Sequence, residues 1–143
     1  MVFLFVKKKK GKTAGEWFEL GLKEKDPKKK IEYFSKCLEL DPKYAYAWNN
    51  KGIALAELGR YEEALRCFDK AIEIDPKYAY AWNNKGVTLH KLERYEEAIR
   101  CFEKAIEIDP EYEEAKNKKK LAEEKLREQK RKEEMERKKA LNA

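Results

Sequence analysis

Asparagine and tyrosine side chains recur in this sequence at a constant spacing. Asn50 is followed 34 residues later by Asn84, and Tyr46 is followed at the same distance by Tyr80. A side-chain amide offers both a hydrogen-bond donor and an acceptor, so a row of amides can bind the backbone of an extended peptide whatever its sequence. Tyrosine adds flat, amphipathic contact area of the type enriched at interfaces. These residues indicate a binding surface, with plain solvation of the asparagines as the alternative.

Residues suited to catalysis or metal binding are few. His90 is the only histidine, which leaves no histidine-paired triad and no histidine-rich metal site. The sequence has three cysteines, Cys37, Cys67 and Cys101. An odd number of widely spaced cysteines matches neither a zinc site nor a disulfide framework. The sequence has no phosphate-binding loop or dinucleotide fingerprint. We therefore expect no enzymatic activity, no cofactor and no metal, and a cytoplasmic protein whose cysteines stay reduced.

Two consecutive units of 34 residues position these side chains. They run from Ala45 to Tyr78 and from Ala79 to Tyr112, and they differ at only eight positions. Self-similarity at a fixed period of this length is typical of stacked repeats, in which each unit buries its apolar face against its neighbours. The recurring pairs include Trp48 and Trp82, Gly52 and Gly86, Tyr61 and Tyr95, Phe68 and Phe102, and Pro76 and Pro110.

The residues and the period resemble the tetratricopeptide repeat, which has the pattern W-x2-L-G-x2-Y followed by Ala, Phe, Ala and Pro at fixed offsets. Both units match most of it, although Lys51 and Lys85 replace the leucine, and Leu55 and Leu89 replace the first tyrosine. The resemblance implies an all-α fold, a right-handed superhelical α-solenoid of antiparallel pairs with about seven helices. It also implies a non-enzymatic scaffold that binds another protein, as an extended peptide or a helix.

The segment before the two units resembles a degenerate first repeat. Trp17, Leu20 and Gly21 match the first half of the pattern, but the unit is three residues short, which predicts a shortened first helix over about Thr13–Lys25. The predicted single domain has five segments: an apolar and basic tail at 1–13, the degenerate repeat at 14–44, repeats at 45–78 and 79–112, and a charged capping helix at 113–143.

Aspartate–proline pairs predict where the helices begin. Asp26 is suited to cap a helix that has Pro27 at its first position. The pairs at 41–42, 75–76 and 109–110 repeat this signal, so we expect each aspartate to accept from the next helix. Gly59 predicts a flexible turn, whereas Glu93 at the equivalent place predicts no positive φ. The further predicted helices are Pro27–Leu40, Lys43–Leu58, Tyr61–Ile74, Lys77–Leu92, Tyr95–Ile108 and one from Glu111 onward.

The resemblance also implies a concave groove lined by the first helix of each repeat. The groove residues it implies are Tyr46, Asn49, Asn50, Ile53, Ala56 and Glu57 in one unit and Tyr80, Asn83, Asn84, Val87, His90 and Lys91 in the next, with Phe18, Glu19 and Leu22 before them and Asn117, Lys118 and Leu121 after them. A subfamily clamps the terminal carboxylate of heat-shock chaperones with lysine, asparagine and arginine. Here only Asn50 matches, so we do not expect that ligand.

The two ends of the chain carry its basic character. The net charge is +5 over residues 1–13, +4 over residues 113–143 and −3 between them, so we expect no specific nucleic-acid surface and at most salt-dependent association. Lysine and glutamate dominate, and Gln129 is the only glutamine, which resembles a heat-adapted composition. The apolar run MVFLFV is too short to span a membrane. We expect it to be a free tail, a homo-oligomer contact or a plug for the protein's own groove. The alternative function is therefore a self-assembling structural repeat protein, joined through residues 1–6 or through the repeat ends.

Overall fold

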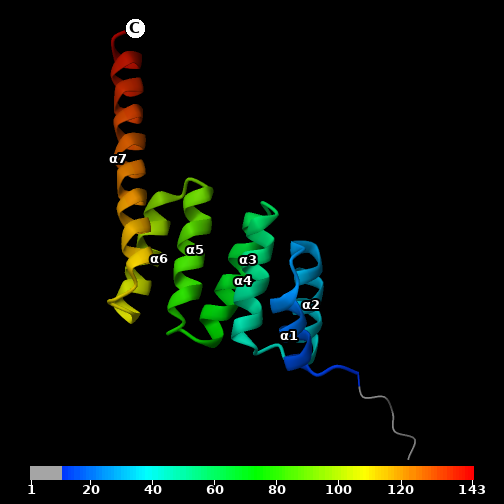
Figure 1. Ribbon diagram of the computed structural model, residues 1–143. Coiled ribbons are helices and arrows are strands. Elements are labelled where there is room, and N and C mark those ends of the chain that lie inside the picture. Colours follow the sequence, from blue (N-terminus) through cyan, green and yellow to red (C-terminus); the bar gives the residue numbers. More distant parts are fainter. Residues whose placement is uncertain (1–10) are drawn as a thin grey trace, which may run out of the picture.

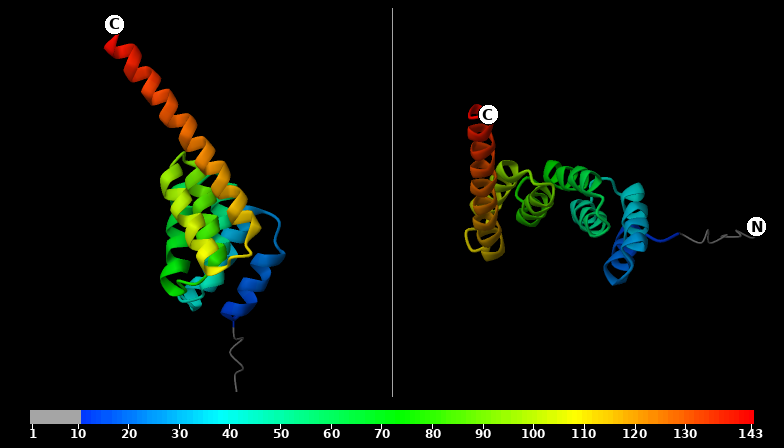
Figure 2. Two further views of the ribbon diagram at one scale, coloured as in Figure 1. Left: turned by 90° about the vertical axis from the view of Figure 1, so that its left-hand side faces the viewer. Right: turned by 90° about the horizontal axis from the view of Figure 1, so that it is seen from above.

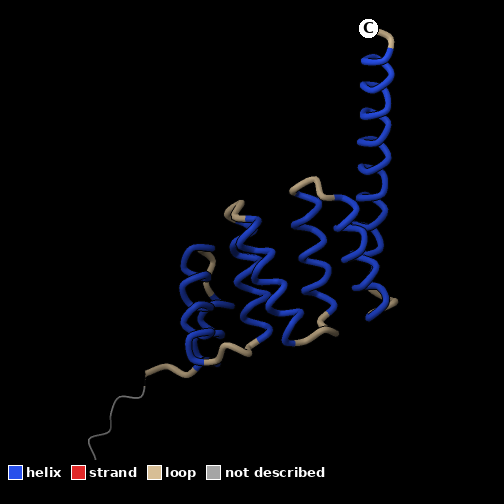
Figure 3. The backbone as a smooth tube through the Cα atoms, turned by 180° about the vertical axis from the view of Figure 1, so that it is seen from behind, coloured by secondary structure: helices blue, strands red, loops and turns tan. Residues whose placement is uncertain are grey.

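The computed structural model describes residues 11–143, and within them the chain forms helices and no strand (Figure 3). The expectations for residues 1–6 lie outside the described residues. The seven helices of residues 11–143 are α1 (Ala14–Lys23), α2 (Pro27–Leu40), α3 (Ala45–Glu57), α4 (Tyr61–Ile74), α5 (Ala79–Lys91), α6 (Tyr95–Ile108) and α7 (Glu113–Leu141).

The helices pack as antiparallel pairs, which confirms the predicted all-α fold. Helix α1 packs on α2, α3 on α4 and α5 on α6, while α7 packs on α6 and projects beyond the body (Figure 1). Seen from above, the pairs follow an arc, with α3 and α5 on its inner side and α4 and α6 on its outer side (Figure 2). The inner helices also contact one another: α3 contacts α5, and α5 contacts α7. Helices α3, α5 and α7 therefore line a common inner face.

Each pair closes on a glycine that faces a phenylalanine. A Cβ atom added to Gly21, Gly52 or Gly86 would lie 2.4 to 2.6 Å from the ring of the phenylalanine on the partner helix. Those rings belong to Phe34, Phe68 and Phe102, and all three are almost fully buried. The recurring glycine is thus required by close packing, since any side chain there would collide with the ring.

The helix starts correct one expectation. Asp26 does cap α2, accepting from the Lys28 N–H at 3.1 Å. Asp41, Asp75 and Asp109 make the same contact with the backbone N–H two residues on, also at 3.1 Å, but there the contact lies in a turn before the helix. The helices α3, α5 and α7 therefore begin two residues later than predicted, and their N-cap tyrosines make no side-chain cap bond.

The turn inside each repeat corrects another expectation. Glu93 has φ 60°, close to the φ 74° of Gly59, so the prediction that Glu93 would avoid positive φ was wrong. In both turns an arginine N–H donates to a leucine carbonyl at 2.9 Å, Arg60 to Leu55 and Arg94 to Leu89. The two repeats thus use the same turn between their helices. The geometry of this turn imposes the left-handed conformation on whichever residue occupies the position.

Helix α7 begins in the register of a further first helix. Its buried residues, Ala115 and Ala122, stand 34 residues after Ala81 and Thr88, which are buried in α5. Lys120 stands in register with Gly86 but is exposed, so the outer side of α7 offers no apolar surface for another helix. From Arg127 onward every residue is exposed. No described helix combines the length and the apolar composition needed to cross a membrane.

Candidate functional site

The inner face of the arc, which we call the concave groove, contains an apolar hollow between α3 and α5. This inner hollow has a volume of about 250 Å³. Apolar side chains form much of its lining, and Glu57 and Lys91 add one negative and one positive charge. Its lining includes Ile53, Ala56, Glu57, Asn84, Val87 and Lys91. The structure thus brings together residues that lie more than 30 positions apart in the sequence, as a binding groove requires.

Tyrosine rings form a continuous row beside this hollow, near the N-terminal ends of α3, α5 and α7. Ring centroids are 5.2 Å apart between Tyr46 and Tyr78, 6.4 Å between Tyr78 and Tyr80, and 5.3 Å between Tyr80 and Tyr112, with edge-to-face geometry. Tyr46 and Tyr80 are 57% and 63% exposed. We call these four residues the tyrosine row. It forms an aromatic surface in which two of the four rings are open to solvent.

Burial distinguishes the other two tyrosines of the row. It raises the pKa of Tyr78 and of Tyr112 to about 12, with smaller contributions from neighbouring tyrosine and carboxylate groups. Both are N-cap residues, and the sequence analysis did not place them in the groove. Their recurrence at the last position of each unit, starting from Tyr44, was the signal that could have identified them.

The asparagines divide into two layers. Asn49 and Asn83 are buried, at 4% and 1% exposure, so they lie beneath the groove surface. The amide of Asn50 donates to the Tyr46 carbonyl at 2.7 Å, and the amide of Asn84 donates to Asn49 Oδ1 at 3.0 Å. The predicted ladder of Asn50 and Asn84 is therefore partly committed to the protein itself, and binding through it remains a prediction.

The buried amide of Asn83 differs from that of Asn49. Neither its Nδ2 nor its Oδ1 has a hydrogen-bond partner within the described chain. The Asn83 amide faces the Tyr112 hydroxyl, and their interaction lowers the pKa of Tyr112 slightly against the larger effect of burial. One unit earlier, the amide of Asn84 donates a hydrogen bond to Asn49. The residue of α7 that stands 34 positions after Asn84 is Lys118.

His90 lies half-buried at the far end of the groove. Its ring meets that of Tyr95 edge to face, with centroids 5.1 Å apart. Burial lowers the pKa of His90, and the positive charges of Lys118, Lys91 and Lys125 lower it further. His90 is therefore neutral at pH 7. Within residues 11–143 no three histidine, cysteine, aspartate or glutamate side chains converge as metal ligands would.

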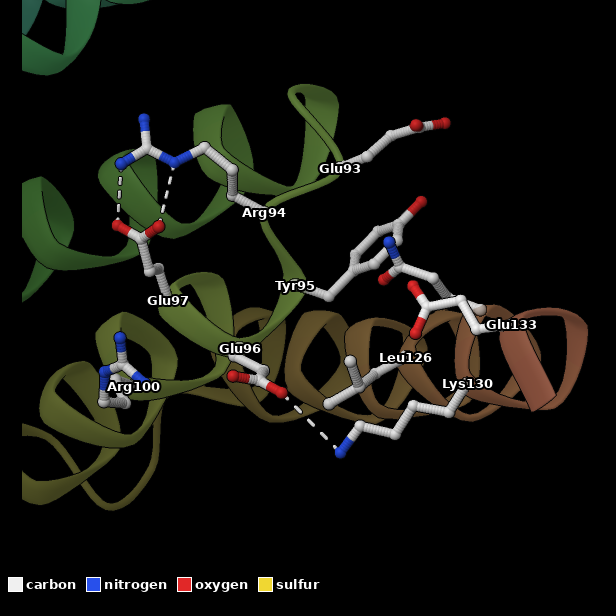
Figure 4. Close-up of a pocket in the computed structure, with 10 residues that line it drawn as sticks. Glu93, Arg94, Tyr95, Glu96, Glu97, Arg100, Leu126, Lys130 and Glu133 are labelled. Atoms are coloured by element: carbon white, nitrogen blue, oxygen red, sulfur yellow. Dashed lines mark hydrogen bonds and ion pairs between the residues drawn. The ribbon is translucent and has the colours of Figure 1, made fainter. Parts of the chain in front are cut away.

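A second hollow, of about 390 Å³, lies outside the groove where α7 leaves the body (Figure 4). Its charged side chains pair with one another: Arg94 binds Glu97 at 2.7 Å, and Lys130 on α7 binds Glu96 at 3.6 Å. The second of these pairs ties α7 to the start of α6. The sequence analysis had no signal for this hollow, because α7 lies outside the repeated units.

Comparison with known families agrees with this geometry. A family model described as "Tetratricopeptide repeat" matches residues 43–111, and one described as "Protein prenyltransferase alpha subunit repeat" matches residues 27–58. An uncharacterized protein of Methanocaldococcus jannaschii is 57% identical over 42 residues, which is 29% of this chain. The chain spans about half of that relative, 49% of its length.

Solved structures of similar shape cover most of the chain. The TPR domain of Arabidopsis OM64 has a TM-score of 0.76 and 26% identity, covering 78% of this chain and 95% of that one. YrrB, described as a TPR protein with an unusual peptide-binding site, has a TM-score of 0.72 and 32% identity, covering 78% and 59%. The first TPR of Spaghetti (RPAP3), bound to the HSP90 peptide SRMEEVD, has a TM-score of 0.77 at 23% identity, covering 80% and 93%, and shows the fold alone.

Proposed function

The chain is a tetratricopeptide-repeat protein, with three helix pairs and a C-terminal helix, and we propose that it is a non-enzymatic module that binds a segment of another protein in its concave groove. The segment is an extended peptide or a helix. Tyr46, Asn50, Tyr80 and Asn84 are the residues we propose to contact it, with Ile53 and Val87 in the inner hollow.

The observation that carries this proposal is the exposure of aromatic side chains on the inner face. Tyr46 and Tyr80 leave more than half of their surface open, although each touches the buried Tyr78. Tyrosine is enriched at interfaces, because its large ring contributes contact area and its hydroxyl remains able to hydrogen bond. Two large aromatic rings that are mostly exposed contribute little to folding, so their exposure favours a role in binding.

The likeness to YrrB supports the same class of function. That protein is described as having a peptide-binding site, and it is 32% identical to this chain over the aligned part. We do not extend the HSP90 peptide to this chain. Phe18 and Leu22 stand where the clamping subfamily has lysine and asparagine, and Tyr80 and Asn84 stand where it has cations.

Location and assembly are separate proposals. We propose a cytoplasmic protein, since Cys37, Cys67 and Cys101 are free and buried. Assembly of copies through residues 1–6 remains a prediction, because those residues lie outside the described part. No specific contact with nucleic acid is proposed.

The test is affinity capture from an extract of the source organism, comparing the natural chain with a Tyr46→Ala, Tyr80→Ala double variant. We expect the double variant to lose the partner that the natural chain retains. The control is Leu40→Ala, which removes an exposed apolar side chain from α2. Retention of the same partner by the double variant, with helix content unchanged, would overturn the proposal.

A further inference from the structure

A hollow between α3 and α4 has an aromatic wall and an apolar floor, and it is separate from the concave groove. Its volume is about 470 Å³. The half-buried Trp48 lines it, and Leu55 and Cys67, at 2% and 5% exposure, lie beneath. We call it the side hollow; its lining residues are Trp48, Lys51, Leu55, Glu63, Arg66, Cys67, Asp69, Lys70 and Glu73. None of them is among the residues that we propose for the concave groove.

The first repeat fills the corresponding place with a tyrosine of its own. Tyr33 stands 34 residues before Cys67, and Trp17 has the place of Trp48 in the repeat pattern. The Tyr33 ring stacks on the Trp17 ring, with centroids 5.8 Å apart and an angle of 28° between the planes. In the middle repeat the smaller Cys67 leaves this space open as the side hollow. The chain itself thus shows that a planar aromatic ring fits against this tryptophan.

The third repeat has a smaller hollow at the same place, of about 350 Å³, and there the lysine is paired. Lys85, which stands 34 residues after Lys51, forms an ion pair with Asp69 at 2.7 Å. The residue 34 positions before Asp69 is Ser35, so Lys51 has no carboxylate at that place. Lys51 Nζ lies 5.7 Å from the centroid of the Trp48 ring. An anionic group bound there would therefore meet the ammonium beside the aromatic ring.

The charges around the side hollow leave an excess of positive charge. Each of the three carboxylates in its lining has a cationic partner: Glu63 pairs with Arg60 at 2.7 Å, Asp69 with Lys85 at 2.7 Å and Glu73 with Lys70 at 3.4 Å. Lys51 and Arg66 have no ion pair with any residue of 11–143. The charges of both act on the Cys67 thiol and lower its pKa against the larger effect of burial, so both lie near the floor.

We propose that the side hollow binds a small aromatic carboxylate. The ring of the ligand lies on Trp48 as Tyr33 lies on Trp17, and its carboxylate accepts a hydrogen bond from the Lys51 ammonium. Arg66 adds the second unpaired positive charge. Charge-assisted hydrogen bonds of this kind are among the stronger ones in proteins. The volume of the side hollow lies within the range of about 300–1,000 Å³ that is usual for small-molecule sites. This binding is independent of the partner segment in the concave groove.

The test titrates the full chain, labelled with an isotope of nitrogen, with phenylacetate while the indole N–H signals are followed by nuclear magnetic resonance. We expect the Trp48 signal to move and to saturate, and the Trp17 signal to stay in place because Tyr33 covers that ring. Phenylacetamide keeps the ring and removes the charge, and it should bind about tenfold more weakly. Cyclohexylacetate keeps the charge and removes the aromatic ring, and it should bind several-fold more weakly.

The titrations can also overturn the inference. A Trp48 signal that does not move with phenylacetate would exclude an aromatic carboxylate from the side hollow. Equal affinity for phenylacetate and phenylacetamide would show that no cation contacts the carboxylate. Equal affinity for phenylacetate and cyclohexylacetate would show that the ring does not stack on Trp48. Each of these results would leave the proposed function intact, because that function concerns the concave groove.

A matched pair of variants locates the ring. Cys67→Tyr should fill the side hollow as Tyr33 fills its place in the first repeat, and we expect the movement of the Trp48 signal with phenylacetate to be lost. Cys101→Tyr makes the same substitution in the hollow of the third repeat, which Cys101 lines. We expect this control to leave the titration of Trp48 unchanged. Equal loss in both variants would contradict binding in the side hollow.

A second pair locates the carboxylate without filling the hollow. Ser35→Asp should give Lys51 the carboxylate partner that Lys85 has in Asp69, and Lys51→Ala removes the ammonium. We expect each variant to weaken phenylacetate about tenfold and to leave phenylacetamide unchanged. Unchanged affinity for phenylacetate in both variants would overturn the proposed contact with Lys51.

Discussion

At the scale of single residues, the repeat depends on a glycine that has no room for a methyl group. In the middle unit a Cβ on Gly52 would lie 2.6 Å from the ring of Phe68. Overpacking of this kind costs about 1–3 kcal/mol. At so short a separation we expect the upper part of that range, which exceeds the gain of about 1 kcal/mol from alanine in a helix.

We predict that Gly52→Ala lowers the free energy of unfolding by about 1–2 kcal/mol, because the Phe68 ring must shift. Gly15 in α1 is the control, since a Cβ there meets only the Thr13 hydroxyl, at 3.9 Å. Gly15→Ala should leave stability unchanged or raise it by up to about 1 kcal/mol. Urea unfolding followed by circular dichroism measures both. A Gly52→Ala protein as stable as the natural chain would show that the two helices are not in such close contact.

Glu93 gives a second prediction at this scale, because it adopts the left-handed conformation that Gly59 adopts without strain. A non-glycine residue in this conformation costs about 1–2 kcal/mol in strain. Glycine removes that strain, but its greater freedom in the unfolded chain cancels part of the gain. Glu93→Gly should therefore raise the free energy of unfolding by several tenths of a kcal/mol, and Gly59→Glu should lower it by about 1 kcal/mol. Thermal unfolding of the reciprocal pair measures this. Shifts of the same sign in the two variants would contradict it.

The buried tyrosines predict a loss of stability at high pH. Tyr78 and Tyr112 have a pKa of about 12 in the folded chain, against about 10 for an unfolded tyrosine. Above pH 10 the unfolded chain loses these protons and the folded chain keeps them, so the free energy of unfolding falls between about pH 10 and 12. Below pH 10 the contribution is fully present.

Urea unfolding at a series of pH values measures this fall. Cys37 and Cys101, whose pKa burial raises to about 11, act in the same direction from lower pH. Comparison with Tyr78→Phe separates them, since phenylalanine keeps the ring and removes the ionisable hydroxyl. We expect a shallower fall in Tyr78→Phe. An identical pH dependence would show that Tyr78 ionises freely in the fold.

At the scale of helices, α7 has a packed first part and an exposed last part. Ala115 and Ala122 are fully buried against the last pair, and Leu126, Lys130 and Glu133 still line the hollow where α7 leaves the body. Beyond Glu133 every side chain of the helix is exposed, and pairs such as Glu134 with Lys138, at 2.9 Å, support it. The first part therefore covers the apolar face of the last helix pair.

Two truncations test this division. Deletion of residues 134–143 should change the free energy of unfolding by less than about 1 kcal/mol, since it removes only exposed side chains and surface ion pairs. Deletion of residues 113–143 should cost several kcal/mol, because it uncovers the apolar face of α6 around Phe102. Urea unfolding measures both. If the longer deletion were as stable as the shorter one, α7 would not be the cap of the array.

The outer helices of the repeats were predictable to the residue, and the inner ones were not. The bounds predicted for α2, α4 and α6 are confirmed, because each ends just before an aspartate–proline pair and begins at a recognisable start. The starts of α3, α5 and α7 were predicted two residues early. The aspartates use their carboxylates inside the turn, and nothing in the local sequence separates that role from a helix cap.

At the scale of the whole molecule, the site is a property of stacking. The sequence predicted which positions of each repeat face the groove, and Ile53, Asn84, Val87 and Lys91 do line one hollow. It could not predict that Asn49 and Asn83 sink below the surface, or that Asn84 crosses to Asn49, since both depend on how closely α3 and α5 approach.

The most direct test of binding in the concave groove is photo-crosslinking from the two faces of the arc. The photoreactive residue p-benzoylphenylalanine is placed at Tyr80 on the inner face in one protein and at Lys70 on α4 in another, both exposed positions. Irradiation in an extract of the source organism should link a partner protein to position 80 and not to position 70. A partner linked only from position 70 would show that binding occurs on the outer face and would contradict the proposal that the concave groove holds the partner.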